Sequence, residues 1–142
     1  MNANRLNYKY MRNNKGFTLI ELLVAISIVA VLATIGFTLF QTTQATARDG
    51  KRRADVDAIS TSLETRFDAA AGTYPIINGS WFADKVTPKD PLDTGVYVYS
   101  YPTATASAYV ACARLEKGGG NFTDAGTTPG SGDYYCKLNQ QQ

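Results

Sequence analysis

The chain has 142 residues and a formal net charge of +2 at neutral pH. Four of its 14 cations, Arg5, Lys9, Arg12 and Lys15, stand in the first 16 residues, which hold no acid. The other ten cations face all twelve acids, so residues 17–142 carry a formal charge of −2, which excludes the broad basic surface of a nucleic-acid-binding protein. Histidine, the commonest general base, is missing, and the sequence shows no nucleophile–base pair, phosphate loop or metal constellation, so we do not expect an enzyme. Two cysteines are too few for a closed structural zinc site.

Residues 17–40 form a nearly continuous apolar run in which Glu21 is the only ionisable side chain. As a helix this run would be about 36 Å long, enough to cross a bilayer. The basic residues before it predict that the N-terminus lies in the cytoplasm. A secretory signal begins in a similar way, but this run is longer and no small-residue cleavage site closes it. The pattern alone therefore predicts a signal-anchored protein with an external domain.

Glu21 needs a further explanation, because a carboxylate in a membrane segment is costly. Cleavage after Gly16 would supply one, since Phe17 would then carry a free amine at the same apolar end. An unpaired charge is strongly penalised in a medium of low dielectric, so pairing of this amine with Glu21, within one chain or between neighbours, would favour a single register.

Residues 15–24, KGFTLIELLV, resemble the class III signal sequence of type IV pilins and type II secretion pseudopilins. The resemblance implies that a prepilin peptidase cuts between Gly16 and Phe17, removes the leader of residues 1–16 and methylates the amine of Phe17. It also implies that Glu21 pairs with the amine of an adjacent subunit as a filament grows.

The same resemblance implies the partners and the location of the chain. The expected partners are further copies and other pilin-like subunits, the peptidase, a membrane assembly platform and, before assembly, membrane lipid. Nucleic acid is not an expected partner of the isolated subunit. The subunit is expected in the cytoplasmic membrane before assembly and in an extracellular or cell-surface filament afterwards.

No proline occurs before Pro75, so one helix is predicted from residue 17 to about residue 71. Residues 17–40 are its transmembrane or filament-core part, and residues 41–72 are its amphipathic part. Gly72 and Pro75 predict where it ends. In the amphipathic part, apolar side chains recur every three or four residues and predict a face packed on a sheet. These side chains are Val56, Ile59, Leu63, Phe67 and Ala70.

A basic cluster lies on the same stretch, and acids alternate with its cations. We interpret it as a solvated helix face, with lipid headgroups or DNA as the alternatives. The cluster consists of Arg48, Lys51, Arg52 and Arg53.

Residues 73–142 are predicted to form a globular head. Turn-forming residues fill the loop of residues 76–95, with Trp81 and Phe82 packed under it. Residues 96–101, 107–115 and 133–138 are the candidate strands, and glycine-rich loops separate the last two. The predicted fold is α+β: a three-stranded antiparallel sheet packed on the amphipathic half of the long helix, as in the type IV pilin fold. The tyrosines of the strands are interpreted as sheet surface rather than as a stacking platform.

Cys112 and Cys136 fall in the second and third candidate strands. An even pair in a domain beyond a membrane segment favours one disulfide in an oxidising compartment. The bridge would enclose the glycine-rich segment and resembles the disulfide-bounded region of many type IV pilins. Two buried thiols remain the alternative.

Asp90 and Asp93 are the only candidates for a metal site. The resemblance implies that calcium is possible, because major pseudopilins of type II secretion carry a calcium-binding loop in the head and carboxylate oxygens are ligands that calcium prefers. Aspartates in such a loop also initiate turns by bonding their own backbone, so we expect no required cofactor and keep calcium as an alternative.

The predicted function is that of a structural subunit of a type IV pilus or pilus-like filament. The alternative in the same family is a pseudopilin of a type II secretion system. A monomeric signal-anchored binding protein, which would keep its leader and never polymerise, is the alternative from another class.

Overall fold

A computed structural model describes residues 16–102 and 106–140. The chain divides into two compact units, residues 1–39 and residues 40–142, which are described separately. Apart from Gly16, the predicted leader lies outside the described residues.

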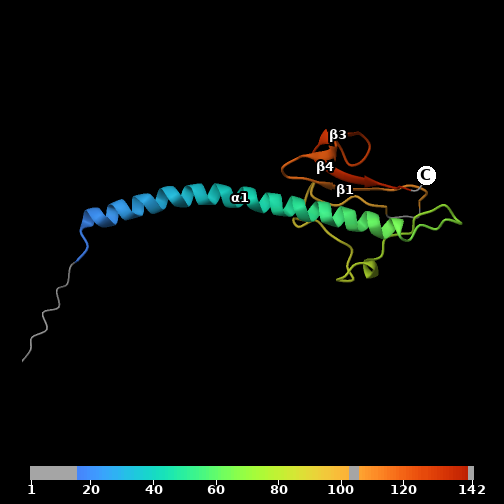
Figure 1. The fold of residues 1–142 in the computed structure, drawn as a ribbon, viewed down its shortest axis with the longest axis horizontal. Helices are drawn as coiled ribbons and strands as arrows, with labels where there is room; N and C mark the ends of the chain where they lie inside the picture. The colour runs from blue at the N-terminus through green and yellow to red at the C-terminus, as the bar shows by residue number, and fades with distance from the viewer. Residues whose placement is uncertain (1–15, 103–105, 141–142) are drawn as a thin grey trace, which may run out of the picture. The chain divides into compact units, whose positions relative to one another are not determined.

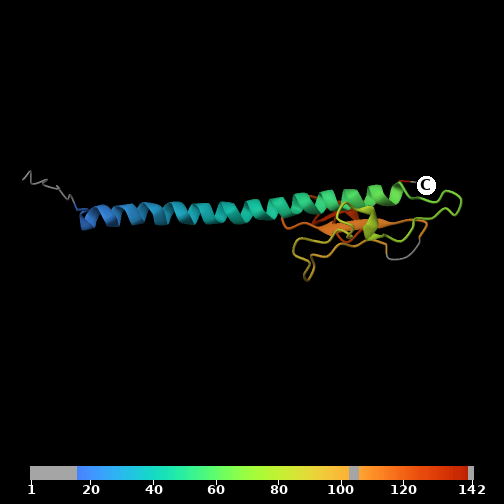
Figure 2. The ribbon, with the colours of Figure 1, turned by 90° about the horizontal axis from the view of Figure 1, so that it is seen from below.

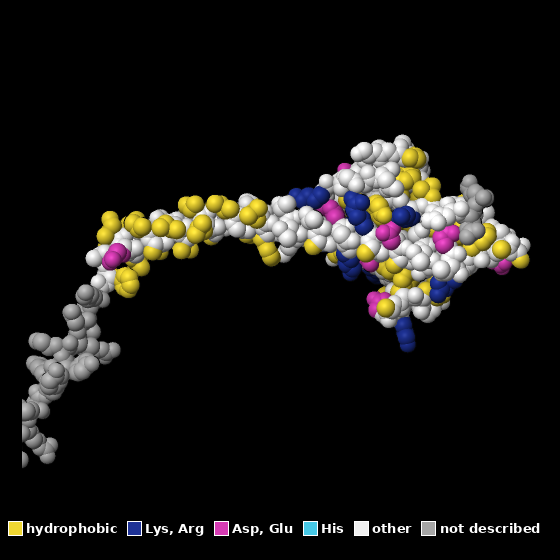
Figure 3. Space-filling view, viewed as in Figure 1, with side chains coloured by type: hydrophobic (Ala, Val, Ile, Leu, Met, Phe, Trp, Pro, Cys, Tyr) yellow, Lys and Arg dark blue, Asp and Glu magenta, His cyan; other side chains and the backbone are white. Residues whose placement is uncertain are grey.

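Helix α1, Leu19–Glu64, begins two residues after Phe17 (Figure 1). In the first unit its side chains are all exposed, and large apolar ones cover it (Figure 3). The helix is long and apolar enough to cross a membrane, with a mean hydropathy of 2.6 in its most apolar window. Exposed apolar surface on this scale needs a cover, which a lipid bilayer or neighbouring helices would supply.

In the second unit α1 buries one face against the head. The predicted apolar face is confirmed for Val56, Ile59 and Leu63, each with no exposed surface. These side chains share a core with Ala111 and Ala113 of the sheet.

The predicted end of the helix near residue 71 is wrong, because α1 stops at Glu64. Asp68 offers the backbone a competing turn. Its carboxylate accepts hydrogen bonds from the amides of Ala70 and Ala71, and its own amide and carbonyl bond Thr73. Gly72 does adopt the predicted left-handed conformation, with φ of 65°, but within this turn rather than at the helix end.

The head contains a four-stranded antiparallel sheet in the order β1-β4-β2-β3. The sheet lies beside the C-terminal part of α1 in both views (Figures 1 and 2). Its strands are β1, Val110–Arg114; β2, Gly120–Phe122; β3, Pro129–Gly132; and β4, Tyr134–Leu138. The α+β fold is confirmed, and it is consistent with the type IV pilin fold. The second and third candidate strands correspond to β1 and β4.

The prediction of three strands is wrong, because β2 and β3 form within the segments predicted to be glycine-rich loops. Glycine is required there for close approach of the backbones. A Cβ at Gly120 would overlap the backbone of Tyr134, and one at Gly132 would overlap that of Phe122. The glycines of these segments therefore belong to a tightly packed and irregular strand pair, β2 and β3. The register of the pair shifts between Gly120 and Phe122.

Residues 96–101, the first candidate strand, do not form a regular strand. They make one antiparallel bridge to β1, in which Ser100 and Cys112 exchange hydrogen bonds of 2.9 and 2.8 Å. Tyr97 turns back to bond the carbonyl of Thr94. The segment is an incomplete edge beside β1.

The interpretation of the tyrosines as sheet surface is wrong for Tyr99 and Tyr109, which are buried in the core with Tyr74. The hydroxyls of Tyr99 and Tyr109 donate hydrogen bonds to the carboxylates of Asp55 and Glu64 on α1. A tyrosine ring can be buried when its hydroxyl is paired in this way. Trp81 and Phe82 pack against the same core, as predicted.

Candidate assembly site

The predicted cleavage point lies immediately before the helix. Gly16 and Phe17 are exposed and have no regular structure, and Phe17 has 90% of its surface exposed. A Cβ atom added at Gly16 would meet no atom within 4 Å among the residues described. The peptide bond between them is therefore accessible in this structure.

Thr18 and Glu21 form a capping box at the start of α1. The amide and the hydroxyl of Thr18 donate to the Oε2 atom of Glu21 at 2.9 and 2.8 Å, and the Glu21 amide donates to the Thr18 hydroxyl at 3.3 Å. Such a box satisfies amides that the first turn leaves unpaired, and a carboxylate there is favoured by the helix dipole. Glu21 thus has a hydrogen-bond partner, Thr18, within its own chain.

Among the residues described, the helix of the first unit carries open, mostly apolar hollows on its surface. One lies on the helix between Ile20 and Ile28 and includes Glu21. Three hydroxyl groups of this helix donate hydrogen bonds to backbone carbonyls one turn earlier, those of Ser27, Thr34 and Thr38. Their polar groups are satisfied within the helix, which suits burial in lipid or among other helices.

In the second unit, the interpretation of the basic cluster as a solvated face is wrong for Arg52, which has no exposed surface. Arg52 pairs with Asp90 through Nε–Oδ2 and Nη2–Oδ1 contacts of 2.6 and 3.0 Å. It also bonds Asp49 at 2.8 Å and Glu116 at 2.6 Å, while Arg48 binds Glu116 through two bonds of 2.7 and 2.6 Å. We call these five side chains the charged cluster.

The charged cluster perturbs the ionisation of its members. Burial alone would lower the pKa of Arg52, but its hydrogen bonds to Asp90, Glu116 and Asp49 outweigh burial and raise that pKa further above its usual range. The hydrogen bonds from Arg48, reinforced by Arg52, lower the pKa of Glu116 to about 2. Arg52 and Glu116 are therefore both charged at neutral pH.

Asp49 extends the charged cluster into the backbone of the head. Its two carboxylate oxygens accept hydrogen bonds from the amides of Glu116 and Lys117, both 2.9 Å long. The charged cluster thus joins α1 to the loop that carries Asp90 and to the segment that follows β1. These polar contacts hold the head on α1.

The two calcium candidates, Asp90 and Asp93, lie in different surroundings. The carboxylate of Asp90 is fully buried, bound by Arg52 and by the Leu92 amide at 2.9 Å. Asp93 is half exposed and lies 3.7 Å from the Lys89 amine. Within residues 16–102 and 106–140, no group of three or more His, Cys, Asp or Glu side chains is placed to hold a metal ion.

Cys112 and Cys136 are bonded as a disulfide across directly opposed positions of β1 and β4. Both sulfurs lie in a small second core with Phe122. The alternative of two buried thiols does not hold in this structure.

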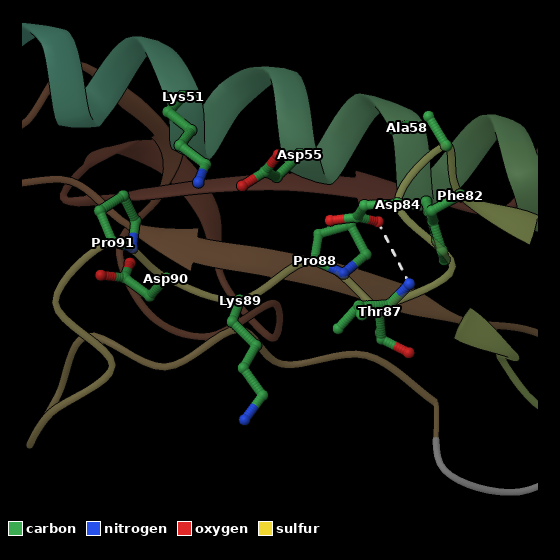
Figure 4. A pocket seen from close by; sticks show the side chains of 12 residues that line it. Lys51, Asp55, Ala58, Phe82, Asp84, Thr87, Pro88, Lys89, Asp90 and Pro91 are labelled. Carbon is green, nitrogen blue, oxygen red and sulfur yellow. Dashed lines mark hydrogen bonds between the residues drawn. The ribbon is translucent and has the colours of Figure 1, made fainter. Parts of the chain in front are cut away.

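An open groove of about 640 Å³ lies between α1 and the loop of residues 82–91 (Figure 4). Lys51 and Asp55 extend from the helix on the side of the groove, and Pro88, Asp90 and Pro91 line the loop opposite. The groove has both charges and apolar walls, without a convergent set of groups that would indicate a catalytic reaction.

Comparison with known proteins agrees with the N-terminal motif. Residues 11–37 match the family described as the prokaryotic N-terminal methylation motif. A fimbrial protein of Pseudomonas aeruginosa is 31% identical over 80 residues, covering 56% of this chain and 46% of that protein. A fimbrial protein of Moraxella nonliquefaciens is 37% identical over 90 residues, covering 61% of this chain and 53% of that protein. No solved structure matches the chain significantly.

The chain therefore carries a prokaryotic N-terminal methylation motif, at the position where the class III signal was predicted, on an α+β fold consistent with the type IV pilins. It is similar to fimbrial proteins and spans about half the length of the curated relatives it matches. The resemblance stated from residues 15–24 is confirmed.

Sequence reasoning missed the charged cluster and the Thr18–Glu21 box. The Thr18–Glu21 box has a sequence signal, because a threonine followed three residues later by a glutamate, just before an apolar run, marks a capping box. The charged cluster has no sequence signal, because Arg52, Asp90 and Glu116 are far apart in the chain.

Proposed function

We propose that the chain is a structural subunit of a type IV pilus or pilus-like filament and not an enzyme. The observation that carries this proposal is the methylation motif of residues 11–37, placed at the start of an apolar helix whose side chains are exposed through residue 44. An accessible cleavage point followed by a long uncovered apolar helix suits a subunit that first waits in a membrane and then packs beside other copies.

In the proposed sequence, the precursor inserts with its N-terminus in the cytoplasm and a prepilin peptidase cuts between Gly16 and Phe17. The new amine of Phe17 is methylated. A membrane assembly platform then transfers the subunit from lipid into the filament, where residues 17–40 of neighbouring copies form the apolar core and the heads form the surface.

Glu21 sets the register in this proposal. Oε2 is held by Thr18 of its own chain, and Oε1 has no hydrogen-bond partner among the described residues. The free oxygen is available to the Phe17 amine of an adjacent subunit. A carboxylate and an amine that are both removed from water attract strongly, and a subunit in the wrong register would leave both unpaired.

The decisive experiment is the intact mass and the N-terminal peptide of protein sheared from the cell surface, with electron microscopy of the same preparation. We expect a chain that begins at methylated Phe17 and long fibres. A chain that keeps residues 1–16 and stays in the membrane would contradict the proposal and favour the signal-anchored alternative.

Processing has a matched pair of variants. Gly16→Val should block cleavage, whereas Gly36→Val should be processed, although a new side chain is free of contacts at both positions. Normal mature mass from Gly16→Val would refute the cleavage point. Short periplasmic fibres tied to secretion, rather than surface fibres, would favour the pseudopilin alternative.

A further inference from the structure

We propose that residues 123–128, the segment between β2 and β3, control the access of reducing thiols to the Cys112–Cys136 disulfide. We call this segment the cap. Asp124 is the positioning residue that keeps the cap closed, and reduction requires the cap to open locally rather than the whole head to unfold. The inference goes beyond the proposed function, because it concerns the redox chemistry of one bond and does not require a filament.

The backbone of the cap lies directly against the two sulfur atoms. Cys112 and Cys136 each expose only 1% of their surface. A Cβ atom added at Gly126, where φ is 103°, would lie 3.0 Å from Cys112 Sγ and would overlap the side chain of Val110. The carbonyl oxygen of Asp124 is 4.0 Å from Cys136 Sγ. A thiolate has to reach a sulfur atom to attack it, so the closed cap blocks this approach to the bond.

The carboxylate of Asp124 ties the two ends of the cap together. Its Oδ1 atom accepts hydrogen bonds from the amides of Thr127 and Thr128 at 2.8 and 3.0 Å, and Oδ2 accepts one from the Thr127 hydroxyl at 2.6 Å. The Thr128 carbonyl accepts bonds from the amide and the hydroxyl of Thr123 at 3.0 and 3.2 Å. An aspartate that accepts nearby amides in this way fixes a turn. Without the carboxylate, the cap would lose three of the bonds that keep it closed.

The cap can open without breaking the sheet. Apart from the contact with Cys136 Sγ, the hydrogen bonds of the cap among the described residues join only its own members. The pairing of β1 with β4, which holds the two cysteines opposite each other, includes no cap residue. The side chains of four cap residues are exposed, those of Thr123, Ala125, Thr127 and Thr128. Segments with few buried contacts and exposed hydrogen bonds open locally at a lower free energy than global unfolding.

The reaction is thiol–disulfide exchange with a dithiol as the reductant. A thiolate of the dithiol attacks one cysteine sulfur, which forms a mixed disulfide and releases the other cysteine as a thiolate that takes up a proton. The second thiol of the reductant then loses its proton and displaces the bound cysteine. The dithiol ends as a cyclic disulfide and both cysteines end as thiols, so atoms and electrons balance. Because the first attack needs an uncovered sulfur, the observed rate scales with the fraction of chains in which the cap is open.

The test measures how fast dithiothreitol reduces the disulfide of the full chain in detergent micelles, with the free thiols alkylated and counted by mass spectrometry. We expect Asp124→Ala to raise the rate at least tenfold. Thr127→Val, which removes only the hydroxyl bond, should raise it less. Asp84→Ala is the matched control, because it removes an exposed carboxylate that accepts the Val86 amide at 3.2 Å in the loop of residues 82–91, and it should leave the rate unchanged.

Urea distinguishes opening of the cap from unfolding of the head. Local opening exposes little surface, so the reduction rate should rise only weakly with urea below the unfolding transition. A rate in the native chain that rises with the full slope of global unfolding would overturn the proposal. So would reduction of Asp124→Ala at the native rate, or equal acceleration in Asp84→Ala. Circular dichroism establishes that each variant folds, and if Asp124→Ala does not, the comparison of Thr127→Val with Asp84→Ala decides.

Discussion

Arg52 and Asp90 form a two-bond ion pair in which neither side chain has any exposed surface. The pair joins the middle of α1 to a loop 38 residues further along the chain. Asp49 and Glu116 surround the same guanidinium, and Tyr97 lies against it with its ring centroid 4.8 Å from Cζ. One attachment of the loop to the helix is thus an ion pair that has no access to water.

Removing one partner of this pair should be strongly destabilising. Asp90→Ala leaves the buried charge of Arg52 short of a partner, and such losses cost about 3–5 kcal/mol. Urea unfolding of the full chain in detergent measures the change. Asp93→Ala, which removes an exposed partner of Lys89 at 3.7 Å, is the matched control and should cost less than about 1 kcal/mol. Equal effects of the two variants would show that the buried pair does not hold the loop.

The charged cluster should also make stability depend on acid pH. Glu116 has a pKa of about 2 in the folded chain, below its ordinary value of 4.5, because Arg48 and Arg52 bond its carboxylate. A group whose pKa is lowered by folding stabilises the protein above its unfolded pKa. That stabilisation is therefore complete above about pH 4.5 and is lost as the pH falls toward about 2.

Unfolding of the native chain and of Glu116→Gln, compared at several pH values, checks this dependence. Other carboxylates, including Asp124 with its lowered pKa, also lose stabilisation in acid, so the difference between the two proteins is the informative quantity. The free-energy difference should be largest at neutral pH and shrink below about pH 4.5. A difference that stays constant down to pH 2.5 would refute the assignment.

The sequence predicted the parts of the molecule that depend on neighbouring residues. The apolar run, the absence of proline, the helix face of Val56 and Leu63 and the N-terminal motif are all local patterns. The helix end was misplaced because Asp68 offers a competing turn that helix periodicity does not register. Composition was an unreliable guide to the strands, because residues 96–101 have the strongest valine and tyrosine content and make only one bridge to β1 among the described residues, whereas β4 forms without a β-branched residue.

The remainder depended on contacts between distant residues. Arg52 has the sequence surroundings of a solvent-facing arginine, and only Asp90 and Glu116, brought in by the fold, make its burial possible. Strands β2 and β3 were hidden because glycine reads as a loop signal, while here glycine permits close packing at Gly120 and Gly132. Composition could not distinguish these two uses of glycine.

The disulfide should supply a large part of the stability of the sheet. The Cys112–Cys136 bond links positions 24 residues apart, and a link of this length stabilises by about 2–4 kcal/mol. The double variant Cys112→Ala, Cys136→Ala should lose about that amount in urea unfolding. Reductant should lower the stability of the native chain and leave the variant unchanged. An equal response of both proteins to reductant would contradict the prediction.

Calcium should leave the head unchanged, because Arg52 and the Leu92 amide already bond both carboxylate oxygens of Asp90. We expect the same melting temperature in millimolar calcium and in a chelator. Asp93→Asn is the informative variant if calcium does stabilise the chain. Loss of that stabilisation in Asp93→Asn would establish a calcium site and favour the pseudopilin alternative.

Glu21 should be required for assembly and dispensable for insertion and processing. Glu21→Ala removes the carboxylate that we assign to the Phe17 amine of an adjacent subunit, so mature protein should accumulate in the membrane while surface filament falls at least tenfold. The capping box complicates this variant, because Thr18 would also lose its partner. Thr18→Val therefore serves as the control: it removes the hydroxyl that caps the helix, at about 0.5–2 kcal/mol, but leaves the carboxylate in place. If Thr18→Val abolishes filaments as fully as Glu21→Ala does, helix capping explains the requirement. If Thr18→Val assembles and Glu21→Ala does not, the role of Glu21 lies between subunits.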